Sequence, residues 1–345
     1  MEVCRGNIRL CVTYLTFAVF ILCALEISWT FLKKNSILFT EPATTIALSN
    51  TKVKALLQKP RSNYLKEHLL IWRDVMKSSK NLPRYLSDRF KAVFNEKEYN
   101  ITMDLLDVFA SNMDANNLTY FIYGGTLIGS LRHHGPIPWD DDIDVFASLN
   151  DQQKIWNVFK RLEPNYVIHK PKMQKFWKFY SKESMTPKND YGWKWPFLDI
   201  FWYTDNGTLL WDWSWSWDAV KLPKEYVFPL IERPFGHLNL KAPKASSNFI
   251  GISTDINRCI SRTWDHKTED SFKLSKQTFS CEKFTKYFPF VTRRETKSEG
   301  TVEYLEKEDK IVSVRVIRDK LLTETKQNND SKTIMSNFGI IRPHP

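Results

Sequence analysis

Four carboxylates stand within five residues near the middle of the chain, at Asp140, Asp141, Asp142 and Asp144. Like charges this close repel one another, and in a partly buried site they raise each other's pKa unless a cation neutralises them. Asp142 and Asp144 alternate with apolar residues, so a strand would place both carboxylates on one face. Hard oxygen ligands suit Mg²⁺ or Mn²⁺. The pattern predicts a divalent metal site; the alternative is a solvated acidic loop, whereas the ligand spacing of an EF-hand is missing.

A pair of glycines precedes the acidic run. Gly124 and Gly125 follow the apolar stretch 118–123 and stand before a helical pattern that starts near Thr126. Glycine at such a strand-to-helix turn permits positive φ and lets backbone N–H groups approach an anion, which the helix N-terminus also attracts. Phosphate is the natural ligand of this turn. The glycine turn followed by Asp-x-Asp is more specific than either part alone.

The stretch 121–146, FIYGGTLIGSLRHHGPIPWDDDIDVF, resembles the signature of the LicD, fukutin and fukutin-related protein family, which belongs to the nucleotidyltransferase-fold superfamily. The family's glycine pair and Asp-x-Asp correspond to Gly124, Gly125, Asp142 and Asp144, and its Pro-Trp-Asp lead-in corresponds to 138–140. The resemblance is strong over this stretch and weaker to about residue 240. It implies metal-dependent transfer of a phospho-alcohol, phosphocholine or ribitol phosphate, from a CDP-activated donor to a glycan hydroxyl.

The resemblance also implies a ligand set. Asp142, Asp144 and a third aspartate on a later strand would hold one or two Mg²⁺ or Mn²⁺, with Asp140 as a further ligand or a base. Asp199 stands at the third position, inside the apolar run 195–203. A carboxylate in such a run needs a partner, because burying it alone costs on the order of several kcal/mol. The metal is the expected partner, and a salt bridge to a nearby Lys or Arg is the alternative.

Contacts to the donor phosphates are expected from the backbone amides of Gly124, Gly125 and Thr126 and from the guanidinium of Arg132, which can bind phosphate in a bidentate manner. His133 and His134 are interpreted as exposed loop residues rather than phosphate ligands. Two other functions stay open: transfer of a nucleoside monophosphate on the same fold, and a non-catalytic glycan-binding relative. The presence of all three expected carboxylates counts against the second of these.

Two aromatic segments follow the acidic run. The stretch 209–217 alternates tryptophan with polar residues, which predicts a strand with its tryptophans on one face. A core face is favoured over a platform for a sugar or a quaternary ammonium. The stretch 166–180 carries lysines among its aromatics, and we interpret it as a solvated strand edge rather than a basic ridge over phosphate. Its lysines are Lys170, Lys172, Lys175 and Lys178.

The order strand, glycine turn, helix, strand, helix predicts an α/β unit. With the family resemblance, residues 98–245 are expected to form an α/β (α+β) catalytic domain, a nucleotidyltransferase-like mixed sheet flanked by helices. Residues 101–113 carry apolar side chains at helical spacing. Residues 33–97 are interpreted as a stem leading into packed helices. The extension 246–345 contains one convincing strand, at 311–317, and no role can be assigned to it.

The N-terminal region contains a candidate membrane segment. Residues 10–32 are almost continuously apolar, with Glu26 as the interruption. As a helix they would span about 34 Å at ~1.5 Å per residue, enough for a bilayer core of about 30 Å. We favour an uncleaved signal-anchor behind a cytosolic tail, 1–9, over a cleaved signal peptide. The family resemblance implies a single-pass type II protein of the Golgi or endoplasmic reticulum membrane with a lumenal catalytic domain; secretion after cleavage is the alternative.

The chain has 345 residues and a formal net charge of +11, which attracts anions without naming them. No recognisable nucleic-acid motif is present, so the expected partners are a nucleotide-activated donor, a glycan acceptor and a membrane. Cys259 and Cys281 could pair in a lumenal protein, or be two unrelated thiols. Glycosylation sequons permit a lumenal location; they start at Asn100, Asn117, Asn206 and Asn329. The oligomeric state is not predicted.

Overall fold

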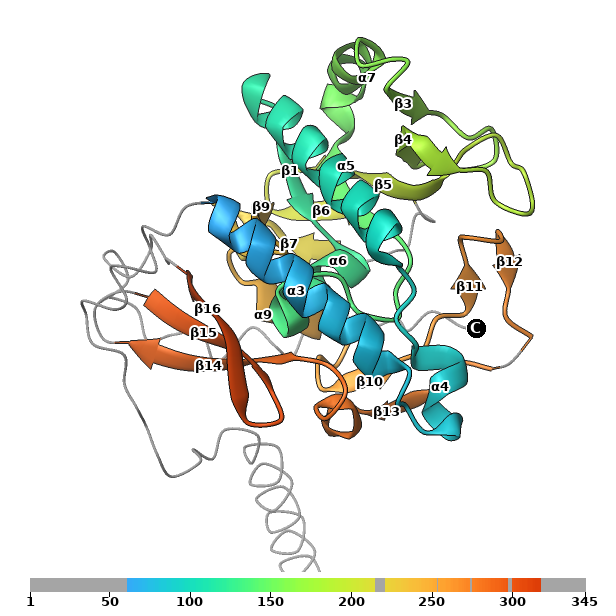
Figure 1. The fold of residues 1–345 in the computed structure, drawn as a ribbon. Coiled ribbons are helices and arrows are strands. Elements are labelled where there is room, and N and C mark those ends of the chain that lie inside the picture. The colour runs from blue at the N-terminus through green and yellow to red at the C-terminus, as the bar shows by residue number, and fades with distance from the viewer. Residues whose placement is uncertain (1–60, 215–220, 253, 274, 297–299, 318–345) are drawn as a thin grey trace, which may run out of the picture. The chain divides into compact units, whose positions relative to one another are not determined.

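The computed structural model describes residues 61–214, 221–252, 254–273, 275–296 and 300–317, which belong to one compact unit (Figure 1). None of the helices in these ranges combines the length and the apolar character needed to cross a bilayer. The predicted tail and anchor lie outside the described residues, as does the first part of the predicted stem, up to residue 60. The anchor therefore stays a prediction.

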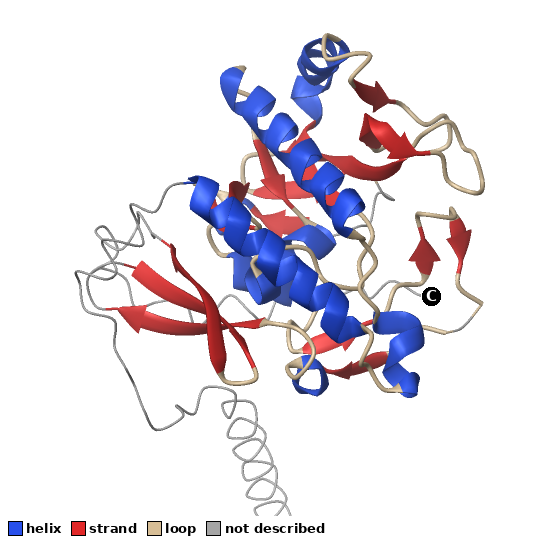
Figure 2. Cartoon of the chain, viewed as in Figure 1, coloured by secondary structure: helices blue, strands red, loops and turns tan. Residues whose placement is uncertain are grey.

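A seven-stranded mixed sheet organises the described part of the chain (Figure 2). Its main strands lie in the order β1 (Tyr120–Ile122), β2 (Ile143–Ser148), β5 (Trp195–Asp205), β4 (Trp177–Met185) and β3 (Tyr166–His169). β6 (Leu209–Asp212) pairs with β5 and with β7 (Lys221–Pro223). β2 and β5 are parallel, and the other neighbours are antiparallel. The predicted mixed α/β fold is confirmed.

Helices α5 (Glu96–Ala115) and α7 (Gln152–Lys160) are two of the helices that contact this sheet. α5 contacts β4 and β5, and α7, which follows a short 3-10 turn, contacts β3. Phe109 of α5 stacks on a phenylalanine ring of α7 with the ring centroids 5.1 Å apart. A capping box starts α5: the Asn95 side chain accepts from the Glu98 N–H, and the Glu98 carboxylate accepts from the Asn95 N–H. Apolar periodicity and a good cap explain why 101–113 was recognisable as helix.

The helices that precede α5 belong to the same core. α3 (Arg61–Ser79) places Trp72 against Tyr99 with ring centroids 4.6 Å apart, and α4 (Arg84–Phe90) buries its last residue. α3 and α4 are thus the packed helices into which the stem was expected to lead, and aromatic residues beside them pack against the sheet domain. Sequence patterning did not indicate where the stem ends and the packed helices begin.

The region after β7 forms small sheets and short helices that pack on the same unit. β8 (Ile231–Phe235) and β9 (Leu238–Ala242) make one hairpin, which α8 (Lys224–Val227) precedes and α9 (Ser246–Gly251) follows. Short strands then pair as β10 (Arg258–Ile260) with β13 (Thr278–Ser280), and β11 (Trp264–Asp265) with β12 (Asp270–Ser271). The last sheet contains β14 (Phe290–Thr296), β15 (Gly300–Lys307) and β16 (Lys310–Ile317), and β16 confirms the strand predicted at 311–317.

A buried charge cluster fastens this last sheet to the core. Glu303 of β15 is 1% exposed, and its carboxylate lies 2.9 Å from Arg233, 2.8 Å from Arg293 and 2.8 Å from His134. His133 is also buried, with Nδ1 2.7 Å from the Pro289 carbonyl oxygen. The expectation that both histidines are exposed loop residues is wrong, since the C-terminal region covers the end of their helix.

The tryptophan-rich strand is shorter than predicted, and its polar face is buried more deeply than its tryptophan face. β6 ends at Asp212, and residues 215–220 lie outside the described ranges. Asp212 and Ser214 are buried, whereas Trp211 and Trp213 are half-buried. The Ser214 hydroxyl accepts from a backbone N–H of β5 at 2.7 Å, and Asp212 accepts from the Ser214 N–H at 2.8 Å. The polar face therefore points inward because it satisfies backbone groups where the strand bends away.

Candidate metal and phosphate site

Two neighbouring parallel strands bring the predicted aspartates together. In the register of β2 and β5, Asp144 lies directly opposite Asp199, and Asp142 stands immediately before β2. One carboxylate oxygen from each of the three residues can be chosen such that all lie within 4.8 Å of one another. Parallel pairing in register makes two strand carboxylates share one face. The three predicted metal ligands thus form one cluster.

Helix α6 (Gly124–His133) begins beside this cluster. Gly124 has φ +50°, and a Cβ there would lie 2.7 Å from Asp144 Oδ2. A Cβ on Gly125 would lie 2.2 Å from Asp140 Oδ2. Only glycine therefore lets the carboxylates approach the turn this closely. Because the first N–H groups of a helix have no partner within the helix, the same turn presents donors to an anion beside the acidic cluster.

Thr126 connects the helix start to the strand that carries Asp144. Its hydroxyl accepts a hydrogen bond from the Asp144 N–H at 2.7 Å, and the Tyr123 N–H donates to the Asp144 carbonyl at 3.1 Å. The start of α6 and the start of β2 are thus bonded on both sides of Asp144. The Thr126 side chain has a positioning role that the sequence analysis did not assign to it.

Asp199 also has the salt-bridge partner that was considered as the alternative. Lys178 lies opposite Asp199 in the register of β4 and β5, and its Nζ is 2.8 Å and 3.0 Å from the two Asp199 oxygens. The ammonium group is 3.5 Å from the centroid of the Phe197 ring, and both charged residues are buried. The prediction of a solvated edge is wrong for Lys178 because β4 lies between β5 and β3. The other three lysines of that stretch are exposed.

The C-terminal region contributes residues that the sequence analysis left without a role. Asp141 accepts from the His266 N–H at 2.8 Å and from the Arg262 guanidinium. The His266 imidazole Nε2 lies 3.0 Å from Asp142 Oδ2, and its Nδ1 lies 3.7 Å from Glu269 Oε1. Asp141, Asp142 and His266 form a second group whose ligand atoms lie within 4.8 Å of one another. No local motif marks His266, since its neighbour in space is 124 residues away.

The guanidinium of Arg132 is bonded to the C-terminal region, which does not support its predicted role in phosphate binding. It lies near the end of α6, and its Nη1 donates to the carbonyl oxygens of Arg258 at 3.3 Å and Ile256 at 3.5 Å. The same nitrogen lies 3.5 Å and 3.4 Å from the sulfurs of Cys259 and Cys281. Arg132 therefore holds the C-terminal region rather than an anion at the helix start.

Burial and mutual repulsion dominate the electrostatics of the cluster. Burial raises the pKa of Asp140 to about 8 and the pKa of Asp199 to about 6, and it raises the pKa of Asp144 well above its ordinary value; the charge of Asp142 adds to each shift. For Asp142, burial alone would raise the pKa, but the charge of His266 and its hydrogen bond outweigh burial, so the pKa is below its usual value. A bound cation would favour the ionised form of every carboxylate in this group.

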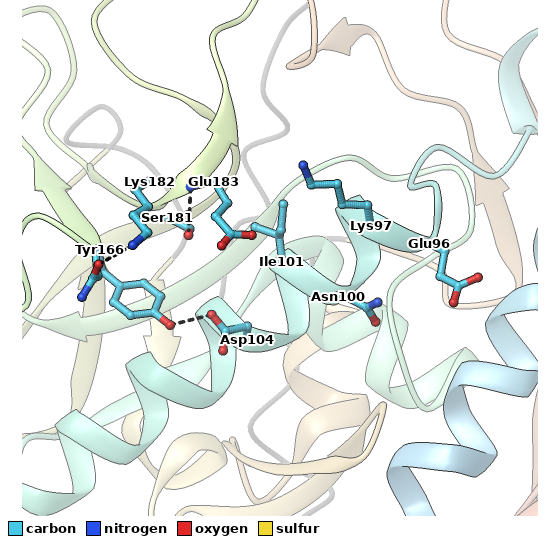
Figure 3. A pocket seen from close by; sticks show the side chains of 10 residues that line it. Glu96, Lys97, Asn100, Ile101, Asp104, Tyr166, Ser181, Lys182 and Glu183 are labelled. Carbon is cyan, nitrogen blue, oxygen red and sulfur yellow. Dashed lines mark hydrogen bonds between the residues drawn. The ribbon is translucent and has the colours of Figure 1, made fainter.

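A separate cleft of about 890 Å³ lies between α5 and strands β3 and β4 (Figure 3). Its walls carry both charge signs, and across it the Tyr166 hydroxyl donates to Asp104 at 2.7 Å. The acidic cluster does not line it. The cleft is therefore distinct from the candidate site.

The paired aspartates, the glycine turn and the start of α6 lie together in this candidate site. A family model described as LicD/FKTN/FKRP, nucleotidyltransferase domain, matches residues 117–245. The family resemblance seen in the motif is thereby confirmed for this domain. The matched range includes the glycine pair and the three clustered aspartates, and it ends before His266.

Two curated relatives are similar over parts of the chain. Lipopolysaccharide cholinephosphotransferase LicD of Haemophilus influenzae is 41% identical over 59 residues, 17% of this chain and 22% of the relative. Ribitol 5-phosphate transferase FKRP of Homo sapiens is 28% identical over 147 residues, 41% of this chain and 28% of the relative. The chain thus spans less than a third of the length of either relative.

Among solved structures, lincomycin-bound lincosamide antibiotic adenylyltransferase LnuA is similar over 43% of this chain and 85% of its own, with 16% identity and a TM-score of 0.31. A TM-score of this size carries no argument about the fold or the activity.

Proposed function

We propose that this chain catalyses the metal-dependent transfer of a phospho-alcohol, of the phosphocholine or ribitol phosphate type, from a CDP-activated donor to a hydroxyl of a glycan on a glycoprotein or glycolipid. The observation that carries the proposal is the in-register pair Asp144 and Asp199, joined by Asp142 and facing the start of α6. The names of the two relatives support a phospho-alcohol as the transferred group.

The donor set fits Mg²⁺ or Mn²⁺, because Asp142, Asp144 and Asp199 offer only hard oxygen ligands, with Asp140 beside them. When bound there, the ion would neutralise the donor pyrophosphate and stabilise the departing CMP. The backbone N–H groups at the start of α6 would hold phosphate oxygens. Asp140 would accept the proton of the attacking hydroxyl while the glycan oxygen bonds to phosphorus and the bond to CMP breaks.

We further propose that the domain works in the lumen of the Golgi or endoplasmic reticulum, anchored by residues 10–32. Cys259 and Cys281 form a disulfide, which was one of the two alternatives for these cysteines. Disulfides persist in oxidising compartments. The three sequon asparagines within the described ranges are exposed: Asn100, Asn117 and Asn206. Exposure is what a lumenal glycan at these positions requires.

The donor is tested by thermal unfolding of residues 35–345 with CDP, CMP, UDP or GDP, each in Mn²⁺ and in EDTA. A ligand at 100 times its Kd adds about 2.7 kcal/mol to the free energy of unfolding, which is measurable as a rise in Tm. We expect a rise with CDP that requires the metal. Absence of a rise with all four nucleotides would contradict the donor assignment and favour a non-catalytic glycan-binding protein.

The direction of transfer needs a second measurement. With a CDP-alcohol donor labelled in its cytidine, the proposal expects the label in free CMP and none on the glycan. Label retained on the acceptor would replace the proposal with nucleotidyl transfer on the same site.

A further inference from the structure

We infer that His266 is a positioning residue of the metal site: it holds the carboxylate of Asp142 in place, and a disulfide-closed segment after the family-matched domain delivers it. We call residues 258–281 the C-terminal arm. The inference rests on the metal in the proposed function, and it concerns a residue outside the range that matches the family model.

The base of the arm is fixed on the body of the protein. β10 and β13 lie side by side and pair antiparallel (Figure 1). The Cys259–Cys281 disulfide joins the two ends of the arm, with the Cα atoms 5.0 Å apart. A disulfide that closes such a loop stabilises the fold by restricting the unfolded chain. Arg132, from the helix that starts at the acidic cluster, donates to the arm at Arg258 at 3.3 Å. The arm therefore leaves and returns at one anchored point.

The middle of the arm lies on the acidic loop. Trp139 Nε1 donates to the Ile260 carbonyl at 2.9 Å, and Asp141 accepts from both Arg262 and the His266 N–H. Asp141 is 2% exposed, so its carboxylate bonds to the arm rather than to solvent. These contacts set the backbone of His266 next to the metal ligands.

The imidazole is then oriented from its other side. Glu269, 4% exposed, accepts from Trp193 Nε1 at 2.7 Å and from Trp264 Nε1 at 3.0 Å, and its Oε1 lies 3.7 Å from His266 Nδ1. The Phe197 ring meets the imidazole edge-on with centroids 5.2 Å apart. The Glu269 carboxylate, fixed by two indoles, and the Phe197 ring thus border the far side of the imidazole, with the carboxylate close enough for a charge interaction but beyond hydrogen-bond distance.

The consequence falls on Asp142. Its Oδ2 lies 3.0 Å from His266 Nε2, which leaves Oδ1 as the oxygen available to a cation. Hydrogen-bonded partners of metal ligands fix ligand orientation, and their removal typically costs 10–100-fold in metal affinity. Without His266, the Asp142 carboxylate would rotate between conformers and lie beside the like charges of Asp144 and Asp199 with no fixed partner.

The test is Mn²⁺ binding to the purified chain, measured by isothermal titration calorimetry without nucleotide, so that the readout is independent of activity. We expect His266→Ala to weaken the Mn²⁺ Kd 10–100-fold and His266→Gln, whose amide can still donate to Asp142, to recover most of it. Lys267→Ala is the matched control: it removes the 2.5 Å contact of the arm with Glu98 and should change the Kd less than twofold.

Unfolding in EDTA checks that each variant folds. Should His266→Ala fail to fold, Glu269→Gln gives the second test, with an expected loss of several-fold in Mn²⁺ affinity. Equal Mn²⁺ affinity in the wild type and the histidine variants would overturn this inference and leave the proposed function intact. An equal loss in Lys267→Ala would show that the arm acts only as a structural support. Absence of Mn²⁺ binding by the wild type would overturn the metal assignment of the proposed function and this inference with it.

Discussion

Asp144 is closely constrained by its neighbours in the candidate site. Its N–H donates to the Thr126 hydroxyl, its Oδ2 would lie 2.7 Å from a Cβ on Gly124, and Asp199 lies opposite it in the sheet. Holding this carboxylate here costs free energy of folding, because burial and the neighbouring carboxylates disfavour its ionised form unless a cation offsets their charge. Asp144 is therefore expected to serve ligand binding rather than the stability of the fold.

The first prediction concerns single charge removals. Asp142→Asn and Asp144→Asn should lower metal-supported transfer at least 100-fold, while their Tm in EDTA stays equal to or above that of the wild type, since one repelling charge is gone. Transfer assays and thermal unfolding check both parts. Asp205→Asn, at the far end of β5 where Asp205 pairs with Lys224, is the control and should keep full activity. Activity retained in either site variant would contradict the metal assignment.

The second prediction is a pH dependence that the metal removes. A carboxyl whose folded-state pKa is raised stabilises the fold below its ordinary pKa, and this contribution is lost as pH rises through the folded-state value. For Asp140, the window runs from about pH 4 to about pH 8. In EDTA, Tm should fall between pH 5 and pH 8, by about 2 °C or more for each kcal/mol lost, and Mn²⁺ should flatten the profile.

Asp140→Asn provides the control for this pH effect, because it should reduce the slope in EDTA without needing metal. Carboxylates with lowered pKa, such as Glu303, act only below about pH 5 and do not enter the window. Identical slopes in EDTA and Mn²⁺ would show that the cluster does not bind the ion.

Local pattern explains which site residues were predictable. Asp142 and Asp144 follow from alternation along one strand, and Asp199 follows from a charge inside an apolar run. Lys178 and His266 do not follow, because the first depends on which strand pairs with β5 and the second on a contact between segments 124 residues apart. The contacts of Arg132 with Ile256 and Arg258 do not follow either, because they join segments more than 120 residues apart.

At the scale of elements, the start of α6 has the geometry that the glycine pair predicts, with both glycines lying against carboxylates. Gly125→Ala would ordinarily favour a helix by up to about 1 kcal/mol, yet the new Cβ would stand 2.2 Å from Asp140 Oδ2. We expect near-normal stability, with transfer reduced on the order of 100-fold because displacing a catalytic group by about 1 Å has that effect. Mn²⁺ titration and transfer rates measure it.

Gly251→Ala is the matched control for that substitution. Gly251 ends α9, and nothing lies within 4 Å of the position its Cβ would take. It should leave transfer and metal affinity unchanged. Equal activity of the two alanine variants would show that the close approach at α6 is not required.

Helices and strands were predictable where apolar residues repeat regularly over a long segment. They were misinterpreted where the buried face depends on contacts with other segments. α5 carries a capped, continuous apolar stripe, and its existence followed from sequence. The face of β6 did not, because the backbone groups that Asp212 and Ser214 satisfy are set by the bend after the strand. Alternation gives two faces but does not say which of them points to the core.

At the scale of the whole described unit, the family-matched range is not a self-contained core. Trp139 packs against Phe90 of α4 and Phe284, with ring centroids 5.1 Å apart in both pairs. Phe94 stacks on Trp195 at the start of β5 with centroids 5.6 Å apart. Aromatic rings from before and after the matched range thus complete the core around the acidic loop.

The last prediction follows from this packing. A fragment of residues 98–245, the domain expected from sequence, should lack a cooperative thermal transition and bind no Mn²⁺, because it exposes Trp139 and Trp195 and loses the arm that carries His266. A fragment of 61–317 should unfold cooperatively and keep the Mn²⁺ affinity of the full chain. Calorimetry of both fragments, with near-ultraviolet circular dichroism as a check of aromatic packing, decides between a catalytic core limited to the matched range and one that needs its flanking segments. A cooperative, metal-binding 98–245 would show that the flanks are accessory and that the arm does not position the site.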